Sequence, residues 1–443
     1  MMNNRKFIQI KFNTLLPRIF VFLLLITFEL LALVLVALIP KSCIQSNMET
    51  SAKFLCENDV FFYANPCDNS SQIDRYADSI LLNIAYNYQS SNPLTSVMSS
   101  SYYHTYDSNE NINLLTAVTE EHDATLEYSR YWHGSIAIIR PMLTLFNIQQ
   151  IYLINSIILV LLLIILLFLL TKYFGKGASL CFLIAATMTS FWYIPMSLEY
   201  TWTILIMLVA SIAVITKLKT ESYDFAILFM VVGNVTAYFD FLTTETLTIL
   251  VPLSIIITYK YLNHTLGSLS SEIKTLLTYG VAWLAGYIFT WLGKWSLASI
   301  ILNRNVFAEA FKQAKFRAGG QGHQMSGLAQ RFGAETRNIS SIYPFSTLGD
   351  NSIMCSLLFF AIVLSLCYIV RKEKCTYNKL LLSLATLPYL RFFILGNHSY
   401  LHYFFTFRAQ LTTIFCLALL LVYGSDKKML SKEWRKLWKK KSN

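Results

Sequence analysis

Apolar residues in this chain occur in solid blocks of about 20, separated by polar stretches, and not in alternation. A helix needs about 20 apolar residues to cross a hydrocarbon core of about 30 Å, whereas the strands of a membrane β-barrel alternate apolar and polar positions. The pattern predicts an all-α polytopic membrane protein with about ten transmembrane helices. They are expected at residues 19–39, 151–170, 178–194, 201–215, 225–238, 247–261, 276–292, 353–370, 380–395 and 405–423.

The polar stretches divide the chain into membrane and non-membrane parts. The longest, residues 41–149, is predicted to be a long external first loop that carries surface helices, and the next, residues 294–351, is a basic external loop. The predicted division is 1–40 (basic cytoplasmic end and first span), 41–149, 150–293 (spans two to seven), 294–351, 352–424 (spans eight to ten) and 425–443 (basic cytoplasmic tail).

The composition agrees with a membrane protein, because 55% of the residues are hydrophobic and only 14% are charged. A soluble protein carries about 25% charged residues. The net charge of +11 comes from Lys and Arg that cluster in the tails and in every second loop. This is the positive-inside distribution, so it indicates cytoplasmic N- and C-termini in a multi-pass plasma-membrane protein and argues against a nucleic-acid partner.

The eight cysteines contain no CxxC pair, so a zinc or redox centre is not predicted. Cys43, Cys56 and Cys67 fall in the first loop, on the predicted external side, where disulfides persist. A Cys56–Cys67 disulfide is one alternative and would leave one cysteine over. Free thiols are the other.

Two carboxylates in the first loop are candidates for catalysis. Asp74 and Asp78 are four residues apart, so they would share one face of a helix. A carboxylate near the membrane surface could act as a general base on an acceptor hydroxyl or hold a metal. The alternative is a solvated helix start, because Asp is favoured in a first turn.

The end of the first loop concentrates polar and aromatic side chains. If residues 130–140 are helical, Arg130, His133 and Gly134 lie near one face, as part of a helix on the membrane surface. Arg130 and Arg140 could then grip a lipid phosphate. The alternative is that the basic side chains anchor the helix at the interface.

An acidic corner follows the fifth span, where Asp240 precedes Glu245 by five positions. The functional hypothesis is a polar contact to substrate at the external face. The alternative is a cap of the sixth span, because Thr243 or Thr244 with a nearby Glu resembles an N-terminal cap.

The stretch 397–408 places two histidines, a serine and an arginine among aromatic residues. His398 and His402, at positions i and i+4, have a metal-ligand spacing, but Ser399 stands where HExxH would have its glutamate. Binding of a phosphate or a sugar is therefore favoured, with Arg408 as the phosphate partner. The basic stretch 312–323 is either a cover for an anionic ligand or a disordered loop.

The predicted architecture resembles the C superfamily of integral-membrane glycosyltransferases (GT-C). The shared features are a cytoplasmic N-terminal end, a long acidic first loop, a surface helix leading into the second span, and about ten spans. Segments 130–134 and 397–408 also look similar to segments of bacterial multispanning proteins without a settled function. The chain departs from two known patterns: no Asp-Glu pair follows the first span as in protein mannosyltransferases, and no WWDxG-like motif of oligosaccharyltransferases is present.

The resemblance implies a polyprenyl-phosphate-linked sugar donor, a catalytic first-loop carboxylate and basic residues on the lipid phosphate. We therefore expect an inverting glycosyltransferase of a bacterial cell envelope, with a glycan, lipid or protein acceptor, in which Asp74 or Asp78 is the base. The expected substrate- and phosphate-binding residues are Arg130, His133, Arg140, Asp240, His398, His402 and Arg408. No cofactor is expected, although a divalent cation is compatible with this chemistry.

Two other classes of function remain open. A transporter or lipid flippase would need ionisable residues at mid-membrane, and Glu29 is almost the only one. A membrane O-acyltransferase would use His133 or His398 as its base, but it would be expected to carry that histidine near mid-span.

Overall fold

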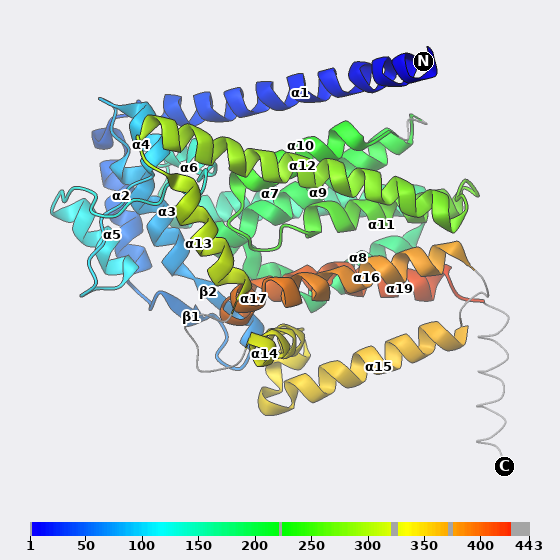
Figure 1. Cartoon of the computed structure of the whole chain (residues 1–443). Coiled ribbons are helices and arrows are strands. Elements are labelled where there is room, and N and C mark those ends of the chain that lie inside the picture. Colours follow the sequence, from blue (N-terminus) through cyan, green and yellow to red (C-terminus); the bar gives the residue numbers. More distant parts are fainter. Residues whose placement is uncertain (1, 221–223, 320–326, 371–374, 427–443) are drawn as a thin grey trace.

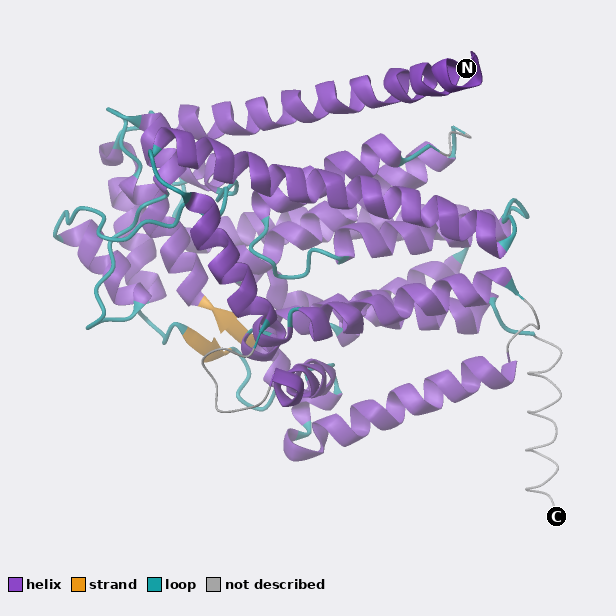
Figure 2. Cartoon of the chain, in the orientation of Figure 1, coloured by secondary structure: helices purple, strands orange, loops and turns teal. Residues whose placement is uncertain are grey.

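The protein is nearly all helical (Figures 1 and 2). A computed structural model describes residues 2–220, 224–319, 327–370 and 375–426. Within these ranges one small antiparallel sheet pairs β1 (Phe61–Tyr63) with β2 (Gln72–Asp74), and Phe61 lies opposite Asp74. The predicted basic tail lies mostly outside the described residues.

In the part of the chain that the structure describes, ten helices form a bundle and run roughly along one common direction (Figure 1), and each of them overlaps one of the ten predicted spans. They are α1 (Met2–Ala37), α7 (Ile148–Phe174), α8 (Lys176–Met188), α9 (Leu198–Leu218), α10 (Ala226–Phe239), α11 (Leu247–Leu262), α12 (Leu269–Ile301), α15 (Ser352–Val370), α16 (Thr376–Ile394) and α19 (Leu411–Tyr423).

Among the described residues, six helical segments are long and apolar enough to cross a membrane, as expected of a multi-pass protein. They are Leu16–Ala37, Ile148–Phe174, Leu198–Leu218, Leu269–Ile301, Gly349–Ile369 and Tyr403–Tyr423. Helices α8, α10 and α11 have 13, 14 and 16 residues, fewer than the roughly 17 of a full span. Helix α16 has 19 residues but carries Lys379 and Arg391.

Shorter elements cover one end of the bundle, on the left in Figure 1. Most come from the 41–149 segment, and the rest follow α12 and α16. They are α2 (Lys41–Leu55), α3 (Arg75–Asn87), α4 (Pro93–Ser99), α5 (Glu110–Thr119), α6 (Ile136–Met142), α13 (Val306–Ala318), α14 (Gly327–Ser340), α17 (Gly396–Leu401) and α18 (Tyr403–Thr406). The 3-10 turns are η1 (Asn69–Ser71), η2 (Phe191–Met196), η3 (Phe345–Thr347), η4 (Gly349–Asn351) and η5 (Phe407–Gln410).

The two ends of the bundle differ in what they carry. Helix α1 begins, and α19 ends, at the end opposite to these cap elements (Figure 1). The outer faces of the long helices are apolar: Phe20, Phe28 and Val281 are 66%, 68% and 65% exposed. Lipid tails are as apolar as these side chains, so such faces can lie in contact with the hydrocarbon core of a bilayer.

The helix predicted over 130–140 begins later, at Ile136. His133 adopts a left-handed φ of 54°, which interrupts a right-handed helix. Gly134 then packs directly on α10: its N–H donates to the Tyr238 carbonyl at 3.0 Å, and a Cβ there would lie 2.3 Å from the Tyr238 ring. The expectation of one helical face carrying Arg130, His133 and Gly134 is therefore wrong.

Cys56 and Cys67 are free thiols in this structure, so of the two alternatives, a disulfide or free thiols, the second holds here. The Cys56 thiol donates to the Asn111 carbonyl with an Sγ–O distance of 3.3 Å, and Cys67 is exposed.

Candidate functional site

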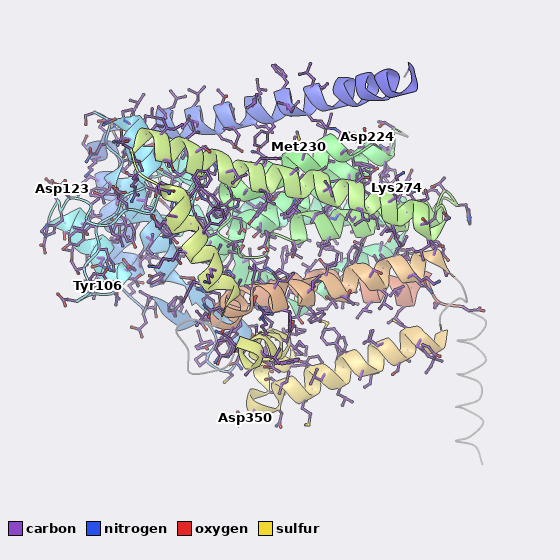
Figure 3. The ribbon with its side chains drawn as sticks, viewed as in Figure 1. Tyr106, Asp123, Asp224, Met230, Lys274 and Asp350 are labelled. Atoms are coloured by element: carbon purple, nitrogen blue, oxygen red, sulfur yellow. The ribbon has the colours of Figure 1, made fainter. Side chains whose placement is uncertain are left out.

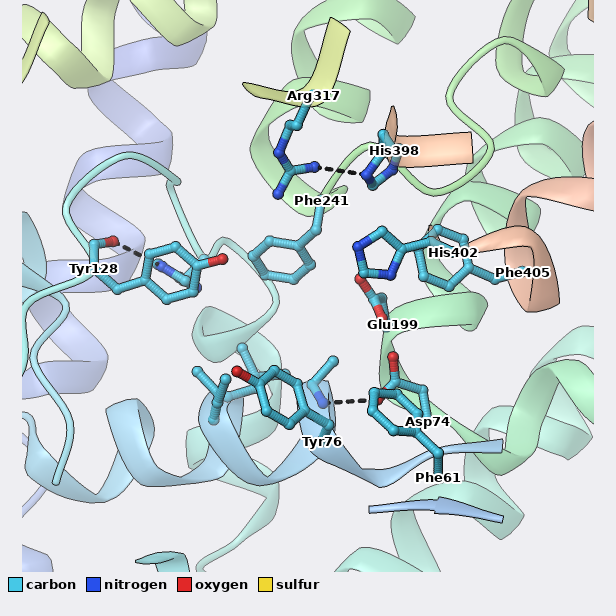
Figure 4. Close-up of a pocket in the computed structure, with 14 residues that line it drawn as sticks. Phe61, Asp74, Tyr76, Tyr128, Glu199, Phe241, Arg317, His398, His402 and Phe405 are labelled. Atoms are coloured by element: carbon cyan, nitrogen blue, oxygen red, sulfur yellow. Dashed lines mark hydrogen bonds between the residues drawn. The ribbon is translucent and has the colours of Figure 1, made fainter. Parts of the chain in front are cut away.

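A cavity of about 300 Å³ lies where the cap elements meet the bundle (Figure 4). Arg317 and His398 form one wall of it, and Asp74 and Tyr76 form the opposite wall. The lining residues are Phe61, Asp74, Tyr76, Ala77, Ile80, Leu81, Tyr128, His133, Glu199, Phe241, Arg317, His398, His402 and Phe405.

Asp74 is placed by the junction of β2 and α3. Its backbone is extended, with φ of −103° and ψ of 96°, and its carboxylate accepts the Ala77 N–H at 2.8 Å. This is the geometry of an N-cap, which stabilises the helix start by satisfying one of its free N–H groups. The predicted alternative of a solvated helix start does not hold, because Asp74 is only 3% exposed.

Glu199, in the first turn of α9, faces Asp74 across the cavity floor, and the two carboxyl groups are hydrogen-bonded to each other. Two buried carboxyls this close cannot both be ionised, so the pair holds a proton. Asp74 also accepts the Ala77 N–H, which favours its ionised form, and Glu199 is therefore the proton donor. Burial raises the pKa of Asp74 to about 6, so it is mostly a carboxylate at neutral pH.

Asp78 lies outside the cavity, against the start of α9. Its carboxylate accepts the Leu198 N–H at 2.9 Å and 3.0 Å, the Ser197 hydroxyl at 3.2 Å and the Tyr152 hydroxyl. Burial raises its pKa to about 7. These contacts tie α3 to α9, so Asp78 holds Glu199 in position relative to Asp74 and does not face the cavity itself.

His398 and Arg317 form the opposite wall. The Leu242 carbonyl accepts the His398 Nε2–H at 2.8 Å, so Nδ1 is the acceptor for the Arg317 Nη1–H at 3.1 Å. Burial and the Arg317 charge lower the pKa of His398 well below its ordinary range, so the imidazole is neutral. His398 thus aims the Arg317 guanidinium into the cavity.

Two further histidines line the cavity as neutral side chains. The His402 ring stacks on Phe405 with a centroid distance of 5.2 Å, and burial lowers its pKa to about 4. The Tyr128 carbonyl is 3.1 Å from Nε2 of His133, and burial lowers the pKa of this histidine to about 3. Among the described lining residues, the lone cation is therefore Arg317.

The structure places the other predicted basic residues elsewhere. Arg130 forms an ion pair with Glu309 at 2.5 Å and lies over the Tyr128 ring; it does not line the cavity, but it lines an apolar groove that adjoins the cavity. Arg140 is fully buried and donates to the Ile39 and Tyr88 carbonyls at 2.7 Å and 3.3 Å, and burial lowers its pKa to about 10. The expectation that these two arginines grip one phosphate is not supported by these positions.

Arg408 is buried on η5, where its Nη1–H donates to the Phe404 carbonyl at 2.9 Å and its guanidinium lies 4.6 Å from the Tyr200 ring centroid. It packs inside the bundle and does not reach the cavity, contrary to its expected role as phosphate partner.

Asp240 shapes the turn between α10 and α11. Its carboxylate accepts the Leu242 N–H at 2.9 Å and the Thr243 N–H at 3.1 Å. Burial and the neighbouring Glu245 raise its pKa to about 7. Asp240 therefore supports the turn that presents Phe241 and the Leu242 carbonyl to the site, and it caps this turn instead of the predicted sixth span.

Of the nine predicted site residues, Asp74, His133, His398 and His402 line the cavity together. Glu199 was missed, and Arg317 was predicted only as part of the basic stretch 312–323. Glu199 is a single acid at the start of an apolar run, so it reads as a helix start, and Arg317 is one of several cations in a basic loop. Tyr76 and Tyr128 were also missed, because tyrosines near a membrane surface are common anchors.

An apolar groove of about 220 Å³ adjoins the cavity and shares Arg317 with it. Its aromatic walls are Tyr131, Trp291 and Trp295, and the Arg317 guanidinium lies 5.7 Å from the Tyr131 ring centroid. A molecule with a polar head in the cavity and an apolar tail in the groove would pass beneath this guanidinium.

Within the described ranges, no group of three or more His, Cys, Asp and Glu side chains could hold a metal ion. No family model matches the chain, and neither a curated protein nor a solved structure matches it.

Proposed function

We propose that the protein is a membrane glycosyltransferase that moves a sugar from a polyprenyl-phosphate carrier to an acceptor hydroxyl in this cavity. The observation that carries the proposal is the arrangement of one ionised carboxylate, Asp74, opposite one guanidinium, Arg317, beside an apolar groove. Such a donor is a phosphate with an apolar tail, and these features match its two parts.

The reaction forms a bond between the acceptor oxygen and the anomeric carbon and breaks the bond from that carbon to the phosphate oxygen. Asp74 takes the hydroxyl proton as general base. Arg317 stabilises the negative charge that grows on the leaving phosphate. Glu199 keeps Asp74 ionised by donating a hydrogen bond to it, so it is a positioning residue. Attack opposite the leaving group inverts the anomeric centre.

The groove is suited to the first units of the polyprenyl chain. Its surface is almost entirely apolar and aromatic, from Tyr131, Leu242, Trp291 and Trp295. Chain binding there would hold the phosphate at Arg317, so binding energy from the tail would orient the reacting carbon toward Asp74.

The proposed setting is a bacterial plasma membrane with about ten spans, both termini in the cytoplasm and a GT-C-like external loop. Under this topology the cavity opens to the outer face, where the acceptor is a cell-envelope glycan, lipid or protein. The short helices α8, α10 and α11 would then be spans in a part of the protein that thins or shields the bilayer.

The test is transfer by the purified full chain from a panel of short-chain prenyl-phosphate sugars, with release of prenyl phosphate as the readout. Asp74→Asn should lower kcat by about 10²- to 10⁴-fold. The exposed Asp107→Asn, in the same segment, is the matched control. Full activity in both Asp74→Asn and Asp74→Ala would remove the proposed base.

Arg317 can be tested in the same assay. Arg317→Gln should lower kcat/KM by about 10²-fold, because it removes the charge that faces the leaving phosphate. Arg304→Gln is the control, since Arg304 is a half-exposed partner of Glu127 and lines neither the cavity nor the groove. Equal activity of the two arginine variants would contradict the assignment of Arg317.

A further inference from the structure

A second large groove lies between α1 and α12, toward the end of the bundle opposite to the cavity. Its volume is about 860 Å³, and Met230 of α10 forms part of its floor. Figure 3 labels Met230 and Lys274 in this region. One wall is a continuous stripe of α12, with Lys274, Leu277, Val281 and Phe289 three to eight positions apart, which is the spacing of one helical face.

The groove is deep because α12 presents small residues there while it packs tightly on α10. A Cβ on Gly286 would lie 2.0 Å from the Met230 carbonyl oxygen, so the two backbones touch. Ala282 and Ala285 leave open space in front of that contact. Phe22 of α1 meets Phe289 edge to face at 6.2 Å, which closes the groove at its inner end.

Two cations stand at the outer end of the groove. Arg18 and Lys274 both line it, and neither forms an ion pair with any residue that the structure describes. The nearest acid on α12, Glu272, is already held by Lys260, with Nζ 2.5 Å and 2.6 Å from its two oxygens. The site therefore combines an uncompensated positive mouth with an apolar interior.

We propose that this groove binds one anionic phospholipid, with the phosphate on Arg18 and Lys274 and an acyl chain along α12. Basic pockets between membrane helices recognise anionic head groups through such cations. From Lys274 to Phe289 the helix rises about 22 Å at 1.5 Å per residue. One leaflet of the hydrocarbon core is about 15 Å deep, so the groove is long enough for a whole acyl chain.

The bound lipid fills the gap between α1 and the rest of the bundle. The site is separate from the cavity of the proposed glycosyl transfer, and it does not depend on that function. A helix from a second copy of the chain would fit the apolar wall, but it would leave the two cations unmatched unless it carried acids at the same depth.

The test is native mass spectrometry of the full chain in a neutral detergent, with dioleoyl phosphatidylglycerol and dioleoyl phosphatidylcholine at equal concentrations. Phosphatidylglycerol should bind in preference. Arg18→Gln with Lys274→Gln should weaken its binding by about 25-fold, at about a factor of five for each charge. Lys176→Gln with Lys379→Gln, two exposed lysines at the same end of the bundle, should retain it.

A second arm fills the groove. Ala285→Trp should reduce binding of both lipids, whereas Leu284→Trp, on the preceding position of α12 and outside the groove, should not. Equal binding of the two lipids by the wild-type protein would overturn the proposal, as would unchanged phosphatidylglycerol binding in the double charge variant. A dimer that Ala285→Trp abolishes without any change in lipid binding would assign the groove to a second copy instead. The charge variants decide the question even where Ala285→Trp does not yield folded protein.

Discussion

Asp74, at the end of β2, and Glu199, in the first turn of α9, hold one proton between them. The pKa of Asp74, raised to about 6 by burial, makes the base competent only above that pH. For stability the direction is opposite: a carboxyl whose folded-state pKa exceeds its unfolded value near 4 stabilises the fold when protonated, and that contribution is lost as the pH rises through 6.

The pH dependence of activity should follow Asp74. With a transferable sugar donor, kcat/KM should rise about tenfold per pH unit below pH 6, which is the acidic limb of the profile, and level off above pH 6. The cavity histidines titrate at lower pH, with pKa values of about 3 for His133 and about 4 for His402, so they do not supply this limb.

Substitutions of Glu199 provide the control for that profile. Glu199→Gln retains a hydrogen-bond donor for Asp74 and should leave the limb in place. Glu199→Ala removes the donor and should move the limb to higher pH, because the hydrogen bond from Glu199 lowers the pKa of Asp74. If the acidic limb of the pH profile is identical in both variants, the Asp74–Glu199 pair does not determine it.

Asp78 should matter for stability more than for chemistry. Asp78→Ala leaves the buried Leu198 N–H and Tyr152 hydroxyl without their acceptor. The loss should lower the free energy of unfolding by about 3 kcal/mol, measured by thermal unfolding in detergent. Glu57→Ala, at an exposed residue, is the comparison and should change the free energy of unfolding by less than about 0.5 kcal/mol.

The residues of the site show what sequence could predict. Asp74 was found because an acid at a helix start beside an apolar stretch is a local signal. Local pattern gave Asp78 only slightly less weight than Asp74, yet three-dimensional packing turns Asp74 to the cavity and Asp78 to the start of α9. The burial of Arg140 and Arg408 likewise depends on carbonyl groups and rings from other elements.

At the level of elements, the turn between α10 and α11 is tied to α16 by a buried ion pair. Arg391 Nε and Nη2 donate to Glu245 at 2.9 Å and 3.0 Å, and Nη2 also donates to the Leu242 carbonyl at 2.6 Å. The same carbonyl accepts from His398, so the ion pair indirectly holds Arg317 over the cavity.

Breaking this ion pair should be costly. Arg391→Met leaves the Glu245 charge buried and should destabilise the protein by about 4 kcal/mol. The double variant Arg391→Met with Glu245→Leu should recover part of that loss, because no unpaired charge remains. The losses of stability are measured from the denaturation midpoints of the wild type, the single variant and the double variant. Equal losses in the single and double variants would mean that the charge pair is not what holds the turn.

Helix positions were predictable because long apolar runs have few other solutions in a membrane. The start of α6 was not predictable, because Gly134 lies outside the helix where it contacts Tyr238, a residue far along the chain. The small sheet of β1 and β2 also went unpredicted, because three-residue strands are too short to show alternation.

The whole molecule carries two proposed sites: the cavity lies among the cap elements, and the anionic-lipid groove has its two cations, Arg18 and Lys274, toward the other end of the bundle. The charge asymmetry of the loops underlies the proposed orientation. Cap packing itself was beyond sequence reasoning, because it joins segments that are far apart along the chain.

Orientation can be tested with cysteine labelling. In a cysteine-free background, a variant that keeps the exposed Cys67 should react with a membrane-impermeant maleimide in intact cells. A variant with Lys176→Cys, at the opposite end, should react only after permeabilisation. The reverse pattern would place the cavity on the cytoplasmic side.

The most direct test of the central claim is an experimental structure of the full chain with a non-hydrolysable prenyl-phosphonate sugar bound. We expect the phosphonate against the Arg317 guanidinium, the prenyl chain between Tyr131 and Trp295, and the sugar beside Asp74. A phosphonate bound at Arg140 or Arg408, or a sugar outside the cavity, would contradict the account.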